Sequence, residues 1–396
     1  MKARGCDLAL PLPEAEYRDR RRMLDRLMDQ LGLQGFVALG SHISYLTGYP
    51  RGGEAVYAQA RDGDGMLLTP WSGSYLEEEG WRIFCGEVVQ VDDLSPVNRL
   101  NPSPDYGGVL EVLEGLGRGR IGLARGFEAD PILVEALRDR LSRERVLDCS
   151  GRLWEARMVK SLREREILKA AFYAVSDSLN EGVKAVEEGV TRGELAGLMA
   201  DNLYIHGVEA LSEGFSAGSG FNPGVLCYPE GEDGALKEGE MVALQVGCRL
   251  YGYTAEASRS VIAGGRGPSI LMECLDALYR SVEVALETAA PGVSLGRVCE
   301  AIREVLGEHW RSRIHGSIHS TGIEAWEPPA SRIGESSAGG SLREGMVLSL
   351  DLSATPKPGL GILKLKEGLL IHGGGVEKLV TGVISDPLRL RIHEGK

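Results

Sequence analysis

Gln245 and Glu256 stand out in the stretch from residue 241 to residue 260, MVALQVGCRLYGYTAEASRS, because they are polar residues in otherwise apolar surroundings. Two such side chains that point to one enclosed place are candidates for a functional site. The plainer interpretation puts each of them on the solvated face of a half-exposed strand. The rest of the sequence is needed to choose between the two interpretations.

Two strands and a turn would position these side chains. Apolar residues alternate with polar or small ones at period two in VALQVG, which predicts a strand. The chain then turns at Gly252, and a second short strand is predicted from Thr254 to Ile262. The strand pair would bring Gln245 and Glu256 to one place.

Composition limits the classes of protein to consider. The chain has 396 residues, of which 43% are hydrophobic and 26% charged, as expected of a globular protein with two domains. A net charge of -13 argues against nucleic-acid binding, which depends on clustered Lys and Arg. No apolar run has the length of a membrane span or a signal peptide, so we expect a cytoplasmic protein with no membrane partner. The 7 cysteines are scattered and are expected to be reduced thiols.

The first 150 residues alternate helix and strand patterns, which predicts an α/β domain with a mostly parallel or mixed sheet. Apolar residues at helical spacing predict a helix over residues 14–31 that stops at Gly32. GFVALGS and GDGMLLTP are predicted strands, and His42 is placed in the loop between them, where we expect it to be solvated. Near Gly151 the alternating strand and helix patterns give way to a long stretch rich in helix formers, so we predict domains at residues 1–150 and 151–396.

The second domain begins with a long helix, predicted from WEARMVKSLREREILKAAFYAVSDSLNEGVKAVEEG, which is rich in good helix formers. Another helix is predicted to begin at Thr191, with Glu194 at capping-box spacing. GVTRGEL at residues 189–195 and GVSLGRV at residues 292–298 share a pattern, and each precedes an amphipathic helix. The match is either chance or the mark of two related halves. MVLSLDLSA and GILKLKEGLLI are predicted strands of the later half.

Four segments of the sequence are informative together: HISYLTGY, RMVKSLREREILKAA, HSTGIEAWEPP and LREGMVLSLD. In this order they resemble the pita-bread peptidases, the family of creatinase, prolidase, aminopeptidase P and methionine aminopeptidase. HISYLTGY is similar to the N-terminal signature of the creatinase and prolidase branch, and RMVKSLREREILKAA to the start of its C-terminal domain. LREGMVLSLD resembles the strand with a metal-binding Glu, and HSTGIEAWEPP the segment around a metal-binding His. The resemblance implies a creatinase-like α/β N-terminal domain, an α+β pita-bread domain with two pseudo-symmetric halves, and a homodimer.

In that family, two Asp, one His and two Glu hold two divalent metals, and a water between the metals attacks the peptide carbonyl. The resemblance places these five positions on Gln245, Glu256, His319, Asp351 and Lys366. Only His319 keeps the residue type of the family. An alignment shifted by one residue would put Glu367 in the last position instead of Lys366. Strand alternation favours Lys366, because it places Lys364 and Lys366 on one side of the strand, opposite Leu363 and Leu365.

These substitutions change the charge of the centre. Glu256 and Asp351 bring two negative charges and Lys366 brings one positive charge, so an ammonium between two carboxylates would stand in for the lost metal. We therefore predict a site with no metal or other cofactor, held by a Lys366–Glu256–Asp351 network. The alternative keeps one Mn, Co or Zn ion on Glu256, His319, Asp351 and Glu367.

The two substrate-facing histidines of the family fall on Cys227 and Trp326. Cys227 is a candidate thiol nucleophile with His319 as its base, although a small buried residue in place of a histidine is the plainer interpretation. Trp326, Glu327 and Arg259 are candidate substrate-binding residues. Trp326 could instead fill space, and Arg259 could form a surface salt bridge.

Three functions remain open. The first is a non-peptidase homologue that binds a small molecule or short peptide without metal-dependent hydrolysis. The second is a Xaa-Pro dipeptidase or aminopeptidase that works with a single metal. The third is a metal-free hydrolase like creatinase, ranked last because that chemistry in the family relies on the histidine that Cys227 replaces.

Overall fold

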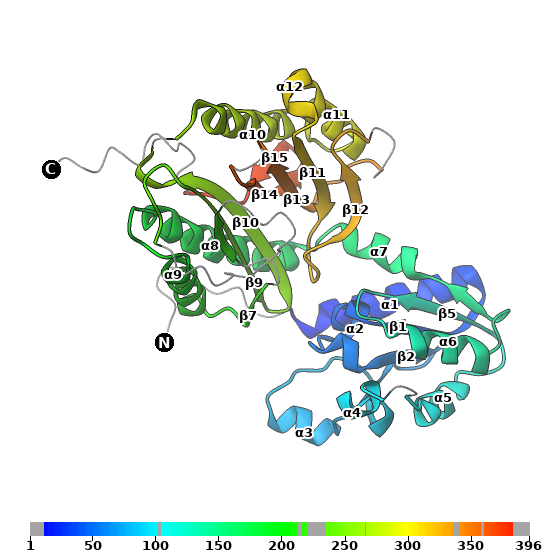
Figure 1. Cartoon of the computed structure of the whole chain (residues 1–396). Coiled ribbons are helices and arrows are strands. Elements are labelled where there is room, and N and C mark those ends of the chain that lie inside the picture. The colour runs from blue at the N-terminus through cyan, green and yellow to red at the C-terminus, as the bar shows by residue number, and fades with distance from the viewer. Residues whose placement is uncertain are drawn as a thin grey trace. The chain divides into compact units, whose positions relative to one another are not determined.

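The computed structural model describes residues 12–101, 104–212, 216–219, 235–265, 267–335, 340–357 and 360–382. The chain forms two compact units, which divide after Ala156, and each unit is built around its own sheet (Figure 1). The division lies inside helix α7 (Ser150–Met158), whereas the sequence pattern placed it after residue 150. Within the described ranges, no helix combines the length and the apolar character that a bilayer span requires.

A six-stranded mixed sheet organises the N-terminal unit, in the order β4-β3-β2-β1-β5-β6. Its parallel pairs are β1 with β5, β3 with β4, and β5 with β6. Its elements are α1 (Glu14–Leu31), β1 (Leu33–Leu39), α2 (Ser41–Thr47), β2 (Val56–Ala60), β3 (Met66–Thr69), α3 (Gly73–Glu78), β4 (Glu87–Gln90), α4 (Pro96–Arg99), α5 (Gly107–Glu114), β5 (Arg120–Arg125), α6 (Pro131–Arg140), β6 (Val146–Asp148) and most of α7. The predicted α/β domain with a mixed sheet is confirmed.

Local predictions in this unit had different outcomes. Helix α1 ends at Leu31, and Gly32 closes it in the left-handed conformation with φ 64, as predicted. The prediction for His42 was wrong, because this residue lies in helix α2 and is fully buried. Its ring lies 4.6 Å from the ring of Trp154, measured between centroids. A segment buried on so many sides forms a helix because its backbone groups need hydrogen bonds that water cannot supply.

A nine-stranded sheet organises the second unit, in the order β12-β11-β13-β14-β10-β9-β7, with β15 paired to β14 and β8 to β9. The strand pairs of this sheet are antiparallel throughout the described residues. Its elements are α8 (Leu162–Lys184), α9 (Arg192–Ile205), β7 (Ala210–Leu211), β8 (Ser216–Ser219), β9 (Met241–Leu250), β10 (Tyr253–Ile262), α10 (Ser269–Thr288), α11 (Leu295–Val305), α12 (Gly307–Arg311), β11 (Ile314–Ser320), β12 (Glu327–Arg332), β13 (Val347–Ala354), β14 (Leu363–His372) and β15 (Gly375–Lys378). The predicted strand pair around Gly252 is confirmed as β9 and β10.

The single long helix that we predicted at the start of this unit is in fact two helices, α7 and α8. Ser161 interrupts the pattern, because its side chain accepts a hydrogen bond from the Glu164 backbone N–H while Glu164 bonds back to the Ser161 N–H. This capping box starts α8. Between the helices, the Lys160 N–H donates to the carbonyl of Gly345 at 2.9 Å. This hydrogen bond connects the junction of α7 and α8 to the turn just before β13.

The repeated sequence pattern corresponds to a repeated structure. Thr191 caps α9 and Ser294 caps α11, each by accepting from the backbone N–H three residues later. Thr191 also forms a β-bridge with Ala235, and Ser294 forms the same kind of bridge with Ser341. Each half thus begins with two long helices and ends in strands, with the short helix α12 added in the second half, which agrees with a pita-bread domain of two related halves.

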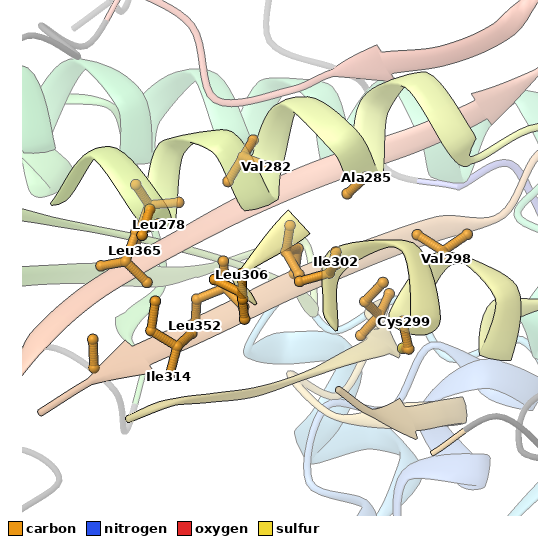
Figure 2. Packing of buried hydrophobic residues seen from close by; sticks show 14 of the residues in the cluster. Leu278, Val282, Ala285, Val298, Cys299, Ile302, Leu306, Ile314, Leu352 and Leu365 are labelled. Atoms are coloured by element: carbon orange, nitrogen blue, oxygen red, sulfur yellow. The ribbon is translucent and has the colours of Figure 1, made fainter. Parts of the chain in front are cut away.

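Apolar side chains of α10 and α11 pack against β13 and β14. Figure 2 shows Leu278 of α10 beside Leu365 of β14. Val282, Ile302 and Leu352 belong to the same buried cluster. Since successive strand residues point to opposite sides, Asp351 and Lys366 project to the other side of the sheet. We call that side, which carries Gln245, Ser258, Lys366, Asp351 and His319, the inner face.

Candidate functional site

Strand register places the predicted site residues in a row across the inner face. Gln245 on β9 lies opposite Ser258 on β10, and Ser258 lies opposite Lys366 on β14. Lys366 in turn lies opposite Asp351 on β13. Directly opposed residues of antiparallel strands share one side of the sheet, so these side chains meet although they are far apart in the sequence.

The ammonium of Lys366 lies between two carboxylates. Its Nζ donates to Glu256 Oε2 at 2.5 Å and lies 3.4 Å from Asp351 Oδ2. The side chains of Lys366 and Glu256 are 2% and 7% exposed, whereas that of Asp351 is 27% exposed. We call these three residues the inner centre. Their contacts are those of the network that the sequence predicted.

Electrostatics keeps the inner centre charged. Burial alone would lower the pKa of Lys366, but the carboxylates of Glu256 and Asp351 outweigh burial and hold this pKa above its usual value. Burial would likewise raise the pKa of Glu256, but the Lys366 ammonium outweighs it and lowers this pKa. Both groups are therefore ionised at neutral pH.

Lys364 brings a second ammonium to the inner face. It lies two residues before Lys366 on β14, and its Nζ donates to Gln245 Oε1 at 3.1 Å. The strand pattern indicated that Lys364 and Lys366 share a side of β14, but it gave no partner for Lys364. The charges of Lys364 and Lys366 together balance those of Glu256 and Asp351.

His319 on β11 is fully buried and stacks on Trp326, with ring centroids 3.7 Å apart and an interplanar angle of 16°. Its Nδ1 lies 3.1 Å from the carbonyl of Ser320, so Nδ1 carries the proton and donates it. Nε2 then holds the lone pair, and it has no partner in the described part of the chain. Burial, followed by the nearby Lys366 ammonium, lowers the pKa of His319 to about 4, so the ring is neutral at pH 7.

Glu367 and Arg259 lie on the opposite side of the sheet from the inner centre. Arg259 Nη2 donates to Glu367 Oε1 at 2.5 Å, and Lys378 Nζ lies 3.0 Å from the same oxygen. The side chains of Arg259 and Glu367 are 1% and 0% exposed, so this is a buried ion pair and not the surface salt bridge that we considered. We call Arg259, Glu367 and Lys378 the outer cluster. The structure therefore does not bring Glu367 to Glu256, His319 and Asp351.

Glu327 is likewise held in a buried ion cluster. Its carboxylate pairs with Arg157 and lies 3.4 Å from Lys160 Nζ, which also donates to Ser320 Oγ at 2.7 Å. All three charged side chains are at most 2% exposed. This geometry anchors the segment that carries Trp326. Arg157 and Lys160 were not identified from the sequence, because they lie inside the stretch that was predicted as one long helix.

Two further expectations concern Cys227 and metal ligands. Cys227 lies outside the described residues, so its geometry relative to His319 is not described. Among the described residues, no three His, Cys, Asp or Glu side chains are grouped as a metal ion would require.

Trp326, a candidate substrate-binding residue, is 46% exposed, and the Lys366 ammonium lies 5.6 Å from its ring centroid.

Comparison with solved structures shows the same fold in several enzymes. The prolidase from Pyrococcus furiosus superposes with a TM-score of 0.75 at 19% identity, over 90% of this chain and 99% of that one. The X-Pro aminopeptidase from Thermotoga maritima gives a TM-score of 0.75 at 20% identity, over 91% and 97% of the two chains.

Sequence comparison gives relatives of the same kind. The Xaa-Pro aminopeptidase 1 of Streptomyces coelicolor is 25% identical over 303 residues, which cover 67% of this chain and 60% of that protein. The Xaa-Pro aminopeptidase of Escherichia coli is 24% identical over 259 residues, covering 59% of this chain and 58% of that protein. The match therefore spans only about 60% of the length of these relatives.

Two family matches cover nearly all of the sequence. Residues 20–159 match the creatinase/prolidase N-terminal domain. Residues 166–377, more than half of the chain, match the metallopeptidase family M24. The predicted family resemblance is confirmed at this level, and the chain belongs to metallopeptidase family M24.

Proposed function

We propose that this M24 protein binds a small molecule or short peptide at the inner face and does so without metal-dependent hydrolysis. The observation that carries the proposal is the position of the Lys366 ammonium between Glu256 and Asp351, 2.5 and 3.4 Å from their carboxylate oxygens. A cation supplied by the chain itself compensates part of the charge of the two carboxylates there, whereas metal ions do so in the family.

The donor set supports this proposal. A protonated amine has no lone pair to offer a metal, and the raised pKa of Lys366 keeps it protonated. Gln245 is neutral, and its Oε1 is engaged by Lys364. Of the five positions that the resemblance assigns to the two metals, two therefore hold side chains that do not suit a divalent ion, and we derive no reaction step through such ions.

The same chemistry limits what the inner centre could catalyse by itself. A nucleophilic or basic lysine needs a lowered pKa, whereas the pKa of Lys366 is raised. His319 is neutral and offers a lone pair, but no described side chain donates to its Nε2. These features support binding over hydrolysis.

The second candidate is a Xaa-Pro dipeptidase or aminopeptidase with one metal. The free Nε2 lone pair of His319 favours it, because a neutral imidazole is a common metal ligand. Glu256 and Asp351 would have to move away from Lys366 to join His319, because no three such side chains are grouped for a metal among the described residues. Glu367 of the earlier alternative would not take part. Metal-free hydrolysis of the creatinase kind stays last, since it depends on the position that Cys227 occupies.

Homodimerisation is carried over from the family as a further proposal, which analytical ultracentrifugation would test.

Metal analysis tests the proposal directly. The chain is purified without added metal, and its Mn, Co and Zn contents are measured by mass spectrometry. We expect well below one ion per chain and no hydrolysis of proline dipeptides, with or without added Mn or Co. Stoichiometric metal, or metal-stimulated hydrolysis, would favour the single-metal peptidase and refute the proposal.

A revertant provides the matched control. The combined substitutions Gln245→Asp, Glu256→Asp, Asp351→Glu and Lys366→Glu rebuild the family's ligand types. We expect this variant to bind Mn or Co in calorimetry, whereas the parent chain does not. If the revertant folds and still binds no metal, the assignment of these positions is wrong.

A further inference from the structure

The sheet of the N-terminal unit has an unpaired edge at β4. This strand is the last in the order of its sheet, and β3 is its only partner among the described strands. The N–H of Val91, directly after β4, donates to the Thr69 carbonyl at 2.8 Å and so points toward β3. Because backbone groups alternate between the two edges of a strand, the N–H and C=O groups of Val88 and Gln90 point to the other edge.

These outward groups are available to a further strand. In the described part of the chain, no backbone hydrogen bond from a turn or loop reaches Val88 or Gln90. Gln90 is exposed and Val88 is half-buried, so a ligand can approach the edge from solvent. Many proteins protect an edge strand with Lys, Pro or a bulge, and β4 is short but has none of these. An extended peptide would therefore form main-chain hydrogen bonds with two residues of β4.

A cavity of about 610 Å³ adjoins the same edge. Val88 of β4 is part of its wall, and so are Leu76 of α3 and three residues of the following loop, Trp81, Ile83 and Phe84. Trp81 is 40% exposed, so this part of the wall is open to solvent. An apolar wall with an accessible aromatic ring suits an apolar side chain of a ligand.

Contacts within the N-terminal unit hold the loop in place. The ring of Phe84 stacks on that of Tyr17 in α1, with centroids 4.5 Å apart and an interplanar angle of 15°. Arg21 of α1 donates to the Phe84 carbonyl, and the Phe84 N–H donates to the Thr47 carbonyl at 2.8 Å. The cavity wall is therefore ordered before a ligand arrives, which lowers the entropic cost of binding.

The surroundings of the edge are acidic. Residues 73–90 contain one basic residue, Arg82, and four acidic residues, so their net charge is −3. The four acidic side chains are exposed and form no ion pair with a described residue: Glu77, Glu78, Glu79 and Glu87. The other two charged residues of the cavity wall, Glu14 and Arg21, carry opposite charges. A partner with positive charge is the electrostatic complement of this surface.

We propose that the outer edge of β4 binds an extended, basic peptide segment of another protein. The segment adds a strand to the sheet through Val88 and Gln90, inserts an apolar side chain into the adjoining cavity, and places Lys or Arg side chains among the four carboxylates. This inference goes beyond the proposed function and is independent of it, because every residue involved belongs to the N-terminal unit.

Peptide analogues test the strand addition on the full chain. The probe is acetyl-Lys-Thr-Phe-Thr-Lys-amide, and its binding is measured by calorimetry. One analogue carries N-methyl groups on both threonines, and a second carries them on Phe and the last Lys. Because only alternate N–H groups of an added strand face β4, we expect one analogue to bind about tenfold more weakly and the other to bind like the probe. The weaker analogue also reveals the direction of the strand.

Two changes of the peptide side chains test the cavity and the charge. Replacement of Phe by Ala should weaken binding by about fivefold, because the cavity is then left unfilled. Replacement of both lysines by glutamate should weaken it by about tenfold at low salt. The second difference should shrink at high salt, which screens exposed charges.

Variants of the protein test the same contacts. Gln90→Pro removes an outward N–H at an exposed residue, and Gln90→Ala is the matched control because it keeps this N–H. We expect binding to weaken about fivefold in the first variant and to stay unchanged in the second. Melting temperatures verify folding, and the N-methylated peptides decide the question on the parent chain if Gln90→Pro does not fold.

A charge variant has its own control. Glu77→Gln combined with Glu87→Gln should weaken binding of the basic probe by about threefold, because both residues line the cavity. The same change at Glu187 and Glu188, which are exposed in the second unit, should have no effect.

Several results would overturn the proposal. These are equal binding of the probe and both N-methylated analogues, unchanged binding to folded Gln90→Pro, equal binding of the lysine and glutamate peptides, or no binding of the probe. If the probe does not bind and Gln90→Pro alone converts a dimer to monomers in analytical ultracentrifugation, the occupant is a second copy of this chain instead. None of these results affects the metal-free function, which is decided by metal content and the dipeptide assay.

Discussion

The inner centre and the outer cluster both include residues of β10 and β14, but the charge at the middle of each has the opposite sign. In the outer cluster, Glu367 is fully buried and contacts two cations, Arg259 and Lys378. In the inner centre, Lys366 contacts two carboxylates, and one of them, that of Asp351, is 27% exposed. Each cluster also has one partly exposed member, Asp351 at 27% and Lys378 at 32%. A buried ion pair with one partly exposed partner is therefore by itself no sign of a binding site.

Removal of the outer anion should have the largest effect. Glu367→Ala leaves Arg259 buried without its carboxylate, and a guanidinium cannot lose its proton to relieve the cost. We expect a loss of about 3–5 kcal/mol in the free energy of unfolding, measured by urea denaturation. A loss below that of the Lys366 variant described below would contradict the structural role of the outer cluster.

His319 should make stability depend on pH. Its pKa is lowered from 6.5 to about 4 in the folded chain, so the unfolded chain binds the proton first as the pH falls. The contribution is fully present above pH 6.5 and is lost between pH 6.5 and 4, by about 3 kcal/mol. Urea denaturation over this range should show the loss in the parent chain, and His319→Gln should lack it. Parallel curves for the two proteins would refute the assignment.

Removal of the inner cation should cost less than removal of the outer anion. Lys366→Met leaves Glu256 and Asp351, but Asp351 is partly hydrated and Glu256 can take up a proton. We expect a loss of about 1–3 kcal/mol at pH 7. The pKa of Glu256 is lowered in the parent chain, so the stability from this pair is lost as the pH falls below about 4.5. The difference between the two proteins should therefore shrink in acid.

Removal of an exposed ion pair should have the smallest effect on the free energy of unfolding. Lys169 on α8 contacts Glu377 on β15 at 2.7 Å, with both side chains 45% exposed. Lys169→Ala should change the free energy of unfolding by less than about 1 kcal/mol, because solvent and salt screen the pair. A larger change would mean that exposure does not rank these ion pairs, and the comparison of the two clusters would fail.

The period-two pattern of the strands predicted which side chains share the inner face. It placed Lys364 and Lys366 on one side of β14, opposite Leu363 and Leu365, and capping signals placed the starts of α9 and α11. These features are local, so the sequence shows them directly.

What the sequence did not indicate depends on contacts between distant residues. Glu327 is paired with Arg157, 170 positions earlier, and this contact turns a candidate substrate residue into an anchor. Arg259 and Glu367 are 108 positions apart and compensate each other inside the fold. The burial of His42 in a helix likewise depends on packing against Trp154. Residue type alone does not show whether a charge faces water or its partner.

The adjacency of Lys366 and Glu367 also bears on how β14 finds its register. A slip of one residue would turn Glu367 toward Glu256 and Asp351, and Lys366 toward Arg259. Like charges would then be buried together on both faces of the sheet. The alternating charges therefore select one strand alignment during folding, and this selection operates independently of any ligand.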